Sequence, residues 1–262
     1  KDTSHKGNYG KTCIVAGSFG KIGAAVLATK SALFSGSGLT YVLAPKCGYE
    51  ILQTTCPEAM YLYGGEDFIK NFTVENDFTY GIGPGLGTDY ETEEKLMHFL
   101  KNYNEPLVLD ADALNLISKN SENLNLIPKK SIITPHPKEF SRLFGESKDS
   151  FERLELAKSK AKELNIYIVL KGHHTQIITP EGNVFYNITG NSGLAKGGSG
   201  DVLLGIITSF LAQGYSPENA TIFGVWLHGK AADFTAEKYS KEAMLASDVI
   251  QHIGEVFKYL QK

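Results

Sequence analysis

The sequence predicts an α/β protein with a mostly parallel central sheet and helices on both faces. Short apolar runs alternate with helical patterns along almost the whole chain, as expected when each strand is followed by a crossover helix. Glycine-rich segments follow several of these runs, at the strand-to-helix turns where such folds bind ligands. At 262 residues, of which 42% are hydrophobic, the chain can bury a sizeable core. With no linker, charge block or repeat to divide it, we predict a single domain over residues 1–262.

The first half of the chain supplies most of the predicted parallel strands. Residues 12–16 form a buried apolar run, and the small and apolar residues that follow recur at helical spacing over about 24–32. Gly36 and Gly38 end that helix. The same alternation predicts strands at 39–44, 78–82, 106–110 and 131–134, and a helix at 91–101.

The second half is predicted to be richer in helix. A helix over about 150–164 precedes a strand at 166–170, and residues 175–179 and 183–187 form a hairpin around Pro180-Glu181-Gly182. Three helices then follow, over 201–212, 217–238 and 248–260, the second with Ser216 as N-cap and Pro217 in its first turn.

Composition excludes several classes of function. Lys and Arg number 26 against 29 Asp and Glu, so the chain has no electrostatic footprint for nucleic acid or an anionic membrane. No apolar run approaches the roughly 20 residues of a spanning helix, and the polar residues 1–10 do not resemble a signal peptide. The three cysteines form no C-x-x-C pair, which predicts a reduced, cytoplasmic protein without a disulfide scaffold or cysteine zinc site.

Arginine is scarce, and this limits how the chain can hold phosphate. Only Arg142 and Arg153 are arginine among the 26 basic residues, a bias that codon usage explains. A phosphate site must therefore use backbone amides, helix N-termini, lysine or a metal.

The strongest motif is the glycine-rich segment 191–201. Gly193, Gly197, Gly198 and Gly200 leave backbone amides free to converge on an anion, and the following helix adds the positive end of its dipole. Asp201, predicted at the first helical position, can accept a proton from a hydroxyl that attacks phosphorus. The alternative is a glycine-rich turn with Asp201 as a simple N-cap, and the loop alone does not decide between them. It is not a Walker A loop, because no G-K-[ST] follows.

Three further segments end strands and could face the same ligand. Four glycines in 81–87 allow a flat ligand to approach the backbone, and exceed what a tight crossover needs. His136, stiffened by flanking prolines, suits either a ligand contact or a rigid exposed loop. Residues 171–175 offer a lysine, amides and a hydroxyl to a polyphosphate, whereas adjacent histidines in a turn seldom chelate a metal together.

Two other segments are ambiguous. The glycines of 17–23 are spaced G-x-x-G-x-x-G, so a dinucleotide fingerprint is only weakly indicated. The carboxylates of 110–115 could hold a metal through water, but capping of the next helix is slightly favoured.

Taken in order, these segments resemble the ADP/ATP-dependent NAD(P)H-hydrate dehydratases, a branch of the ribokinase-like superfamily. The resemblance spans nearly the whole chain, and six modest motifs in one order make it specific. The matching segments are residues 6–10 with 17–23, 81–87, 110–114, the turn at His136, 171–175 and 190–201. Many members carry an epimerase domain ahead of this one.

The resemblance implies a repair reaction. The family removes water from the S-epimer of hydrated NADH or NADPH at the expense of ADP or ATP. The C6 hydroxyl is phosphorylated, and the ring nitrogen then assists the loss of phosphate. A divalent cation, expected to be Mg²⁺, accompanies the nucleotide. Its ligands are not identifiable, and the resemblance suggests a homo-oligomer, a tetramer.

The resemblance also carries over residue roles. Asp201 matches the aspartate that contacts the hydrate and acts as base. The expected nucleotide-binding residues are Lys171, Gly172, His173, His174, Thr175, Gly198, Ser199 and Gly200. The expected substrate-binding residues are Gly23, Ala24, Gly83, Gly85, His136, Glu139 and Asp201.

Two other functions stay open. A ribokinase-like kinase of a small hydroxymethyl heterocycle, such as a vitamin precursor, would use the same loop and aspartate, although the segments 83–87 and 135–139 favour the dehydratase. A non-catalytic adenine-nucleotide sensor would bind the nucleotide but would not need Asp201.

Overall fold

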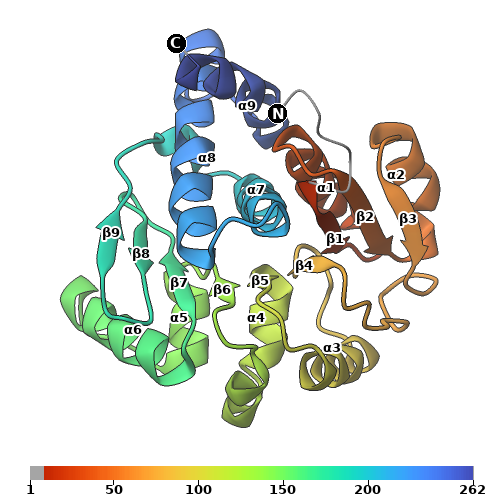
Figure 1. Cartoon of the computed structure of the whole chain (residues 1–262), viewed down its shortest axis with the longest axis horizontal. Helices are drawn as coiled ribbons and strands as arrows, with labels where there is room; N and C mark the ends of the chain where they lie inside the picture. The colour runs from red at the N-terminus through yellow and green to blue at the C-terminus, as the bar shows by residue number, and fades with distance from the viewer. Residues whose placement is uncertain (1–8, 262) are drawn as a thin grey trace.

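The structure, a computed structural model, describes residues 9–261 and is organised around a nine-stranded sheet (Figure 1). The strand order is β3-β2-β1-β4-β5-β6-β7-β8-β9, parallel from β3 through β7 and antiparallel for β8 and β9. This confirms the predicted mostly parallel sheet. The strands are β1 (Lys11–Val15), β2 (Leu39–Ala44), β3 (Met60–Tyr63), β4 (Thr79–Ile82), β5 (Val108–Leu109), β6 (Ile132–Ile133), β7 (Tyr167–Leu170), β8 (Gln176–Ile178) and β9 (Val184–Tyr186).

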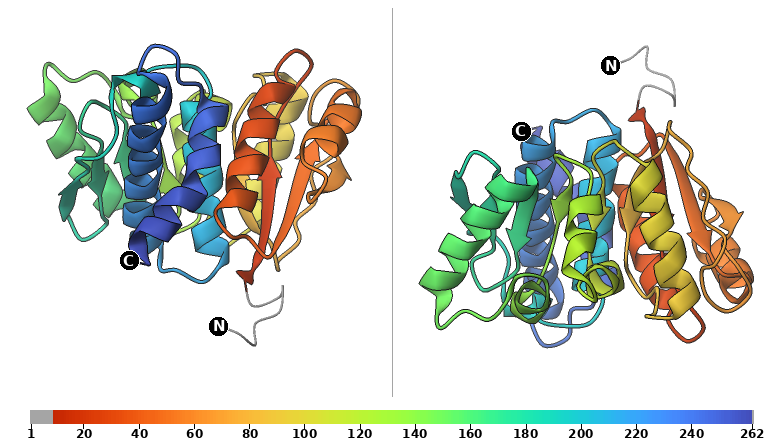
Figure 2. Two further views of the ribbon diagram at one scale, coloured as in Figure 1. Left: turned by 90° about the horizontal axis from the view of Figure 1, so that it is seen from above. Right: turned by 90° about the horizontal axis from the view of Figure 1, so that it is seen from below.

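Helices cover both faces of this sheet (Figure 2). One face carries α1 (Ile22–Phe34), α2 (Tyr49–Thr55), α7 (Ser199–Ala212), α8 (Pro217–Tyr239) and α9 (Ala246–Leu260). The other carries α3 (Tyr90–Asn102), α4 (Ala111–Ile117), α5 (Pro137–Phe144) and α6 (Ser150–Leu164).

The core lies in two layers, one on each side of the sheet. Successive side chains of β1 alternate between them: Cys13 and Val15 pack under α3 and α4, whereas Ile14 packs under α1 and α7. Because the strands are buried on both faces, they read as continuous apolar runs in the sequence.

Several element boundaries differ from the predictions. The prediction missed β3, a strand of four residues at the sheet edge. It also missed α2 and α5 and gave no bounds for α4, the helix after Asp110, because one or two turns give no readable helical period. β5 and β6 have only two residues each. α7 begins at Ser199, so Asp201 is its third residue rather than its first, and the N-cap is Gly198. The part of the motif 6–10 that precedes Tyr9 lies outside the described residues.

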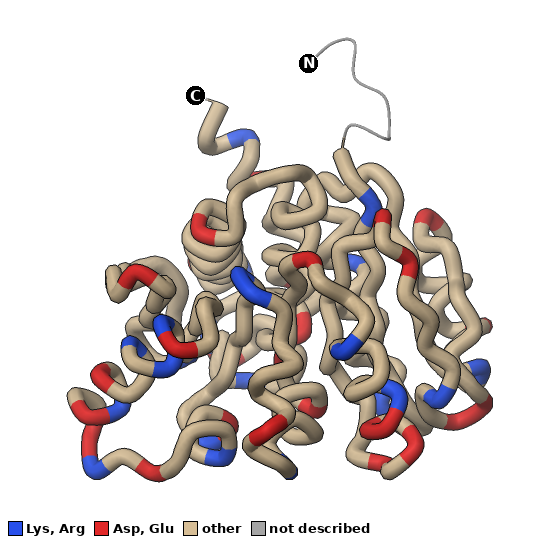
Figure 3. Tube along the Cα trace, turned by 60° about the horizontal axis from the view of Figure 1, so that its bottom comes forward, with Lys and Arg blue, Asp and Glu red and all other residues tan. Residues whose placement is uncertain are grey.

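The described residues also show the character of the helices, the thiols and the surface charge. None of the helices within 9–261 combines the length and apolar character that a membrane crossing needs. Cys13, Cys47 and Cys56 are all free thiols, and the first and last are buried. Basic and acidic residues are interspersed along the trace (Figure 3).

Candidate active site

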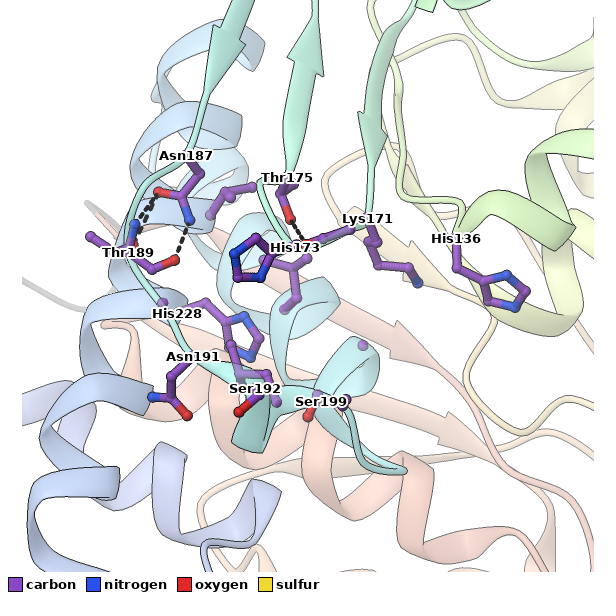
Figure 4. Close-up of a pocket in the computed structure, with 18 of the residues that line it drawn as sticks. His136, Lys171, His173, Thr175, Asn187, Thr189, Asn191, Ser192, Ser199 and His228 are labelled. Carbon is purple, nitrogen blue, oxygen red and sulfur yellow. Dashed lines mark hydrogen bonds between the residues drawn. The ribbon is translucent and has the colours of Figure 1, made fainter. Parts of the chain in front are cut away.

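A cavity of about 690 Å³ opens beside the carboxyl end of β7, where parallel sheets bind their ligands. Its walls come from four parts of the chain: the β7–β8 turn, the segment after β9, the start of α7 and the middle of α8 (Figure 4). The expected nucleotide-binding residues Lys171, Gly172, His173, Thr175, Ser199 and Gly200 line it, with His136 at one side. His174 and Gly198 are not among the lining residues.

The glycine-rich segment forms the N-terminus of α7 and is shaped by its own packing. Gly198 has φ +94°, and a Cβ there would lie 2.6 Å from Leu27 Cδ1. Only glycine fits this backbone and this space. The first-turn amides of a helix lack intrahelical acceptors. Ser199 N donates weakly to Lys196 O at 3.5 Å, whereas the next residue, Gly200, lines the cavity at the positive end of the helix dipole and can offer its N–H to a ligand. This end of the cavity suits an anion.

Beside that helix end lies a partly buried ion pair. Lys171 Nζ donates to Asp110 Oδ1 at 2.8 Å and lies 3.8 Å from Glu139 Oε2. Asp110 is the N-cap residue of α4, yet its side chain makes no capping hydrogen bond and is 1% exposed. A Cβ on Gly200 would come 3.1 Å from Asp110 Oδ2 and 3.4 Å from Lys171 Nζ, so glycine lets α7 approach the pair closely. Asp110 is therefore part of the charged cluster rather than a helix cap.

Asp201 is a weaker acid than an ordinary carboxyl group. Burial, followed by repulsion from Asp110, raises its pKa from 3.8 to about 7, while Lys171 opposes the shift. A carboxylate with a pKa near neutrality is a suitable general base, because it is partly ionised and strongly basic at physiological pH. Asp201 does not line the 690 Å³ cavity, although Gly200 before it does.

His136 and Glu139 form a capping box at the start of α5. His136 Nδ1 accepts from the backbone amides of Lys138 at 3.1 Å and Glu139 at 3.3 Å, and Glu139 Oε2 accepts from the His136 amide at 2.8 Å. Burial lowers the pKa of His136, and Lys171 adds to the effect. His136 thus has a structural role in addition to facing the cavity.

Gly23 and Ala24 lie in the first turn of α1, and Gly83 and Gly85 lie in the loop after β4. These two segments are outside the cavity and pack against each other. Ser18 Oγ donates to Gly85 O at 2.8 Å, and a Cβ on Gly85 would come 2.9 Å from Lys21 O. A Cβ on Gly83, whose φ is +142°, would overlap Asp110 O at 1.8 Å. Packing accounts for these two glycines, and nothing lies within 4 Å of a Cβ on Gly23.

Asp112 connects these loops to the charged cluster. Its Oδ2 accepts from Gly87 N at 2.9 Å and from Lys21 Nζ at 3.3 Å, and its charge also raises the pKa of Asp201. Asp201 therefore lies within electrostatic reach of both the Lys171–Asp110 pair and the loops 17–24 and 83–87.

Some cavity residues were not foreseen from the sequence. They are Asn187, Thr189, Leu203, Val225, His228 and Gly229. Nothing local marks them, because α8 reads as an ordinary long helix and residues 187–189 as the end of a hairpin. Among residues 9–261 no group of three or more His, Cys, Asp or Glu side chains could hold a metal.

Two solved structures resemble the whole fold. One is an ADP/ATP-dependent NAD(P)H-hydrate dehydratase from Bacillus subtilis co-crystallised with ATP/Mg²⁺ (TM-score 0.87, 33% identity, 99% of this chain and 92% of that one). The other is a ribokinase-like superfamily protein from Enterococcus faecalis (TM-score 0.83, 30% identity, 99% and 90%). Fold and site together define a ribokinase-like α/β protein.

Sequence comparisons assign the chain to one family within the ribokinase-like proteins. The family model described as NAD(P)H-hydrate dehydratase matches residues 12–255, and the chain belongs to that family. An ADP-dependent (S)-NAD(P)H-hydrate dehydratase from Neisseria meningitidis is 37% identical over 258 residues, covering 95% of this chain and 85% of that protein. A bifunctional NAD(P)H-hydrate repair enzyme from Thermofilum pendens is 33% identical over 273 residues, covering 99% of this chain. The chain spans 52% of that longer relative.

Proposed function

We propose that this chain repairs nicotinamide nucleotides: it dehydrates the S-epimer of NADH or NADPH hydrate back to NADH or NADPH, using ADP or ATP and releasing phosphate. The observation that carries the proposal is Asp201, a carboxyl group with a pKa of about 7 in the first turn of a helix whose N-terminus faces the cavity. Family membership and the names of the relatives support the choice of substrate.

In this proposal the nucleotide occupies the 690 Å³ cavity with its phosphates toward α7. Lys171, Gly172, His173, Thr175, Ser199 and Gly200 line the cavity and hold the nucleotide through the ammonium group, the hydroxyls and the helix-terminal amides. His174 and Gly198 adjoin these residues in the chain and complete the proposed nucleotide site. The hydrate lies on the other side of Asp201, against Gly23, Ala24, Gly83, Gly85, His136 and Glu139. The hydroxyl to be phosphorylated then meets the terminal phosphate beside Asp201.

The proposed reaction has two steps. Asp201 accepts the proton of the C6 hydroxyl while that oxygen attacks the terminal phosphorus, and the bond from phosphorus to the rest of the nucleotide breaks. The lone pair of the ring nitrogen then expels phosphate from C6, and loss of the C5 proton restores the C5–C6 double bond. Phosphorylation is needed because hydroxide leaves poorly and phosphate leaves readily.

A divalent cation fits this site only as a companion of the nucleotide. Mg²⁺ is commonly held by phosphate oxygens, water and one or two carboxylates. Asp110 and Asp201 are the carboxylates beside the α7 terminus. The ion would neutralise charge that develops on the transferred phosphoryl group. The relative from Bacillus subtilis was crystallised with ATP/Mg²⁺, which supports Mg²⁺ here.

Other properties follow as part of the same proposal. The free thiols favour the reducing cytoplasm, and residues 1–262 act as one dehydratase domain. Family resemblance suggests a homotetramer, which sedimentation of the purified chain would test.

One experiment separates this function from phosphorylation of a small hydroxymethyl compound. The chain is incubated with NADH hydrate labelled with ¹⁸O at C6, and with ADP or ATP. We expect inorganic phosphate, NADH and the shortened nucleotide in equal amounts, with the label in phosphate. A stable phosphoester would indicate a kinase instead. Label that appears only in water would exclude phosphoryl transfer to C6, and an absence of turnover with bound nucleotide would favour a sensor.

A further inference from the structure

His228 is a buried histidine whose role the proposed function does not assign. It lies on α8, is 7% exposed, and lines the cavity (Figure 4). Its Nε2 is buried, and it has no hydrogen-bond partner among the residues that the structure describes. Buried polar atoms are normally paired, and an unpaired one costs stability.

The ring is held neutral where it stands. Burial, together with the charge of Lys171, lowers the pKa of His228 to about 4. At neutral pH the imidazole therefore carries one N–H donor and one acceptor nitrogen. Such a ring forms directional hydrogen bonds with an oxygen-rich ligand and does not act as a cation.

Contacts on either side of His228 fix the backbone that carries the ring. Thr189 Oγ1 donates to Trp226 O at 2.9 Å, and a Cβ on Gly229 would come 2.3 Å from Thr189 Oγ1. Asn191 Nδ2 donates to Ala232 O at 3.1 Å. These contacts lock the middle of α8 against the segment after β9. The backbone that carries His228 is therefore held beside the cavity.

The position of Lys171 in the same cavity indicates which part of a ligand His228 meets. Lys171, whose charge acts on the ring, lines the cavity beside the α7 terminus, the end that suits an anion. A nucleotide with its phosphates at that end brings its ribose and phosphate oxygens near His228.

We propose that His228 binds the nucleotide, with its imidazole Nε2 hydrogen-bonded to an oxygen of the ribose–phosphate moiety. This inference rests on the proposed function, because it needs an adenine nucleotide in the cavity. It adds a binding residue from α8, an element that none of the sequence motifs includes.

Two substitutions test it. His228→Leu fills the space without a polar atom, and His228→Gln restores an amide near the position of Nε2. ADP affinity is measured by calorimetry, and the melting temperature is measured without nucleotide. We expect His228→Leu to keep or raise the melting temperature, since it removes an unpaired buried group, and to weaken ADP binding by about 5-fold or more. His228→Gln should retain most of the affinity.

Equal ADP affinity in wild type and His228→Leu would overturn the inference, as would a lowered melting temperature with unchanged affinity, which marks a purely structural histidine. If the wild type binds neither ADP nor ATP, the proposed function fails as well. That result differs from the failure of the His228 inference alone, in which the wild type still binds nucleotide.

A measurement on the wild type does not depend on how the variants fold. The ring nitrogens of ¹⁵N-labelled histidines are followed by NMR during titration with ADP. We expect the His228 signals to shift. Those of His252 should not, because it lies on α9 with its Nδ1 2.8 Å from Asp248 O. His228 signals that stay unchanged at saturating ADP would exclude the proposed contact.

Discussion

Two glycines that line the cavity and two in the loop beside it have opposite physical roles. A Cβ on Gly172 or Gly197, both of which line the cavity, would meet no atom within 4 Å. A Cβ on Gly83 or Gly85 would meet backbone oxygens at 1.8 and 2.9 Å. One region keeps space open for a ligand, and the other uses its glycines to bring three loops into contact.

The difference shows how the closely packed region serves the open one. Gly83 packs against the backbone of Asp110, whose side chain pairs with Lys171 on the cavity wall. The residue after Asp110, Ala111, has φ +50°, a conformation that costs free energy in a non-glycine residue. The tight loops therefore hold the two carboxylates, Asp110 and Asp112, whose charges add to the effect of burial on the pKa of Asp201.

The largest expected effect concerns Asp201, which lies between the two regions. Asp201→Asn keeps the size of the side chain and removes its basicity, so turnover of NADH hydrate should fall by about 10² to 10⁴-fold. ADP affinity should stay the same or rise, because a negative charge near the phosphates is lost. Steady-state kinetics and calorimetry measure both. Undiminished turnover would mean that Asp201 is not the base.

The next effect tests the two kinds of glycine directly. Gly83→Ala places a methyl group against Asp110 O and forces φ +142° on a non-glycine residue, so we expect a loss of about 3 kcal/mol or more in the free energy of unfolding. Gly197→Ala is the matched control, since its Cβ enters open space, and it should change stability by less than about 0.5 kcal/mol. Similar losses in urea unfolding for the two variants would contradict the comparison.

A smaller effect is expected in the pH dependence of the rate. The base must be ionised, so kcat/KM should fall as the pH drops below about 7, the pKa of Asp201. Asp110→Asn removes a charge that raises this pKa and should move the fall to lower pH. Lys171→Met removes a charge that lowers it and should move the fall to higher pH. Shifts in the same direction for both variants would exclude this account.

The same pKa makes a prediction about stability. Because the pKa of Asp201 is about 7 in the folded chain and 3.8 ordinarily, the folded state binds the proton more tightly between these values. The contribution of Asp201 to the free energy of unfolding should therefore decrease as the pH rises from about 4 to 7. Subtracting the urea-unfolding profile of Asp201→Asn from that of wild type isolates it, and a flat difference would contradict the raised pKa.

The bounds of the long helices and strands could be predicted well from the sequence. Which strand ends lie side by side could not. The helix 150–164 and the strand 39–44 match α6 and β2, because each carries a clear period or a clean apolar run. Lys171 and Asp110 are 61 residues apart, and no local pattern shows that their strand ends meet. The start of α7 was placed two residues late, because the left-handed Gly198 lets the helix begin at Ser199.

The smallest expected effect separates two roles of His136, which faces the cavity and also caps α5. His136→Ala removes both the imidazole and the cap, and should lower the free energy of unfolding by about 1 kcal/mol. His136→Asn keeps a good N-cap, because an asparagine oxygen also accepts the first-turn amides, and should melt within a degree or two of wild type. If His136 contacts the hydrate as proposed, KM for NADH hydrate should rise in both variants, although only one is destabilised. A KM that rises only in the alanine variant would show that His136 acts through the helix it caps and not through the substrate.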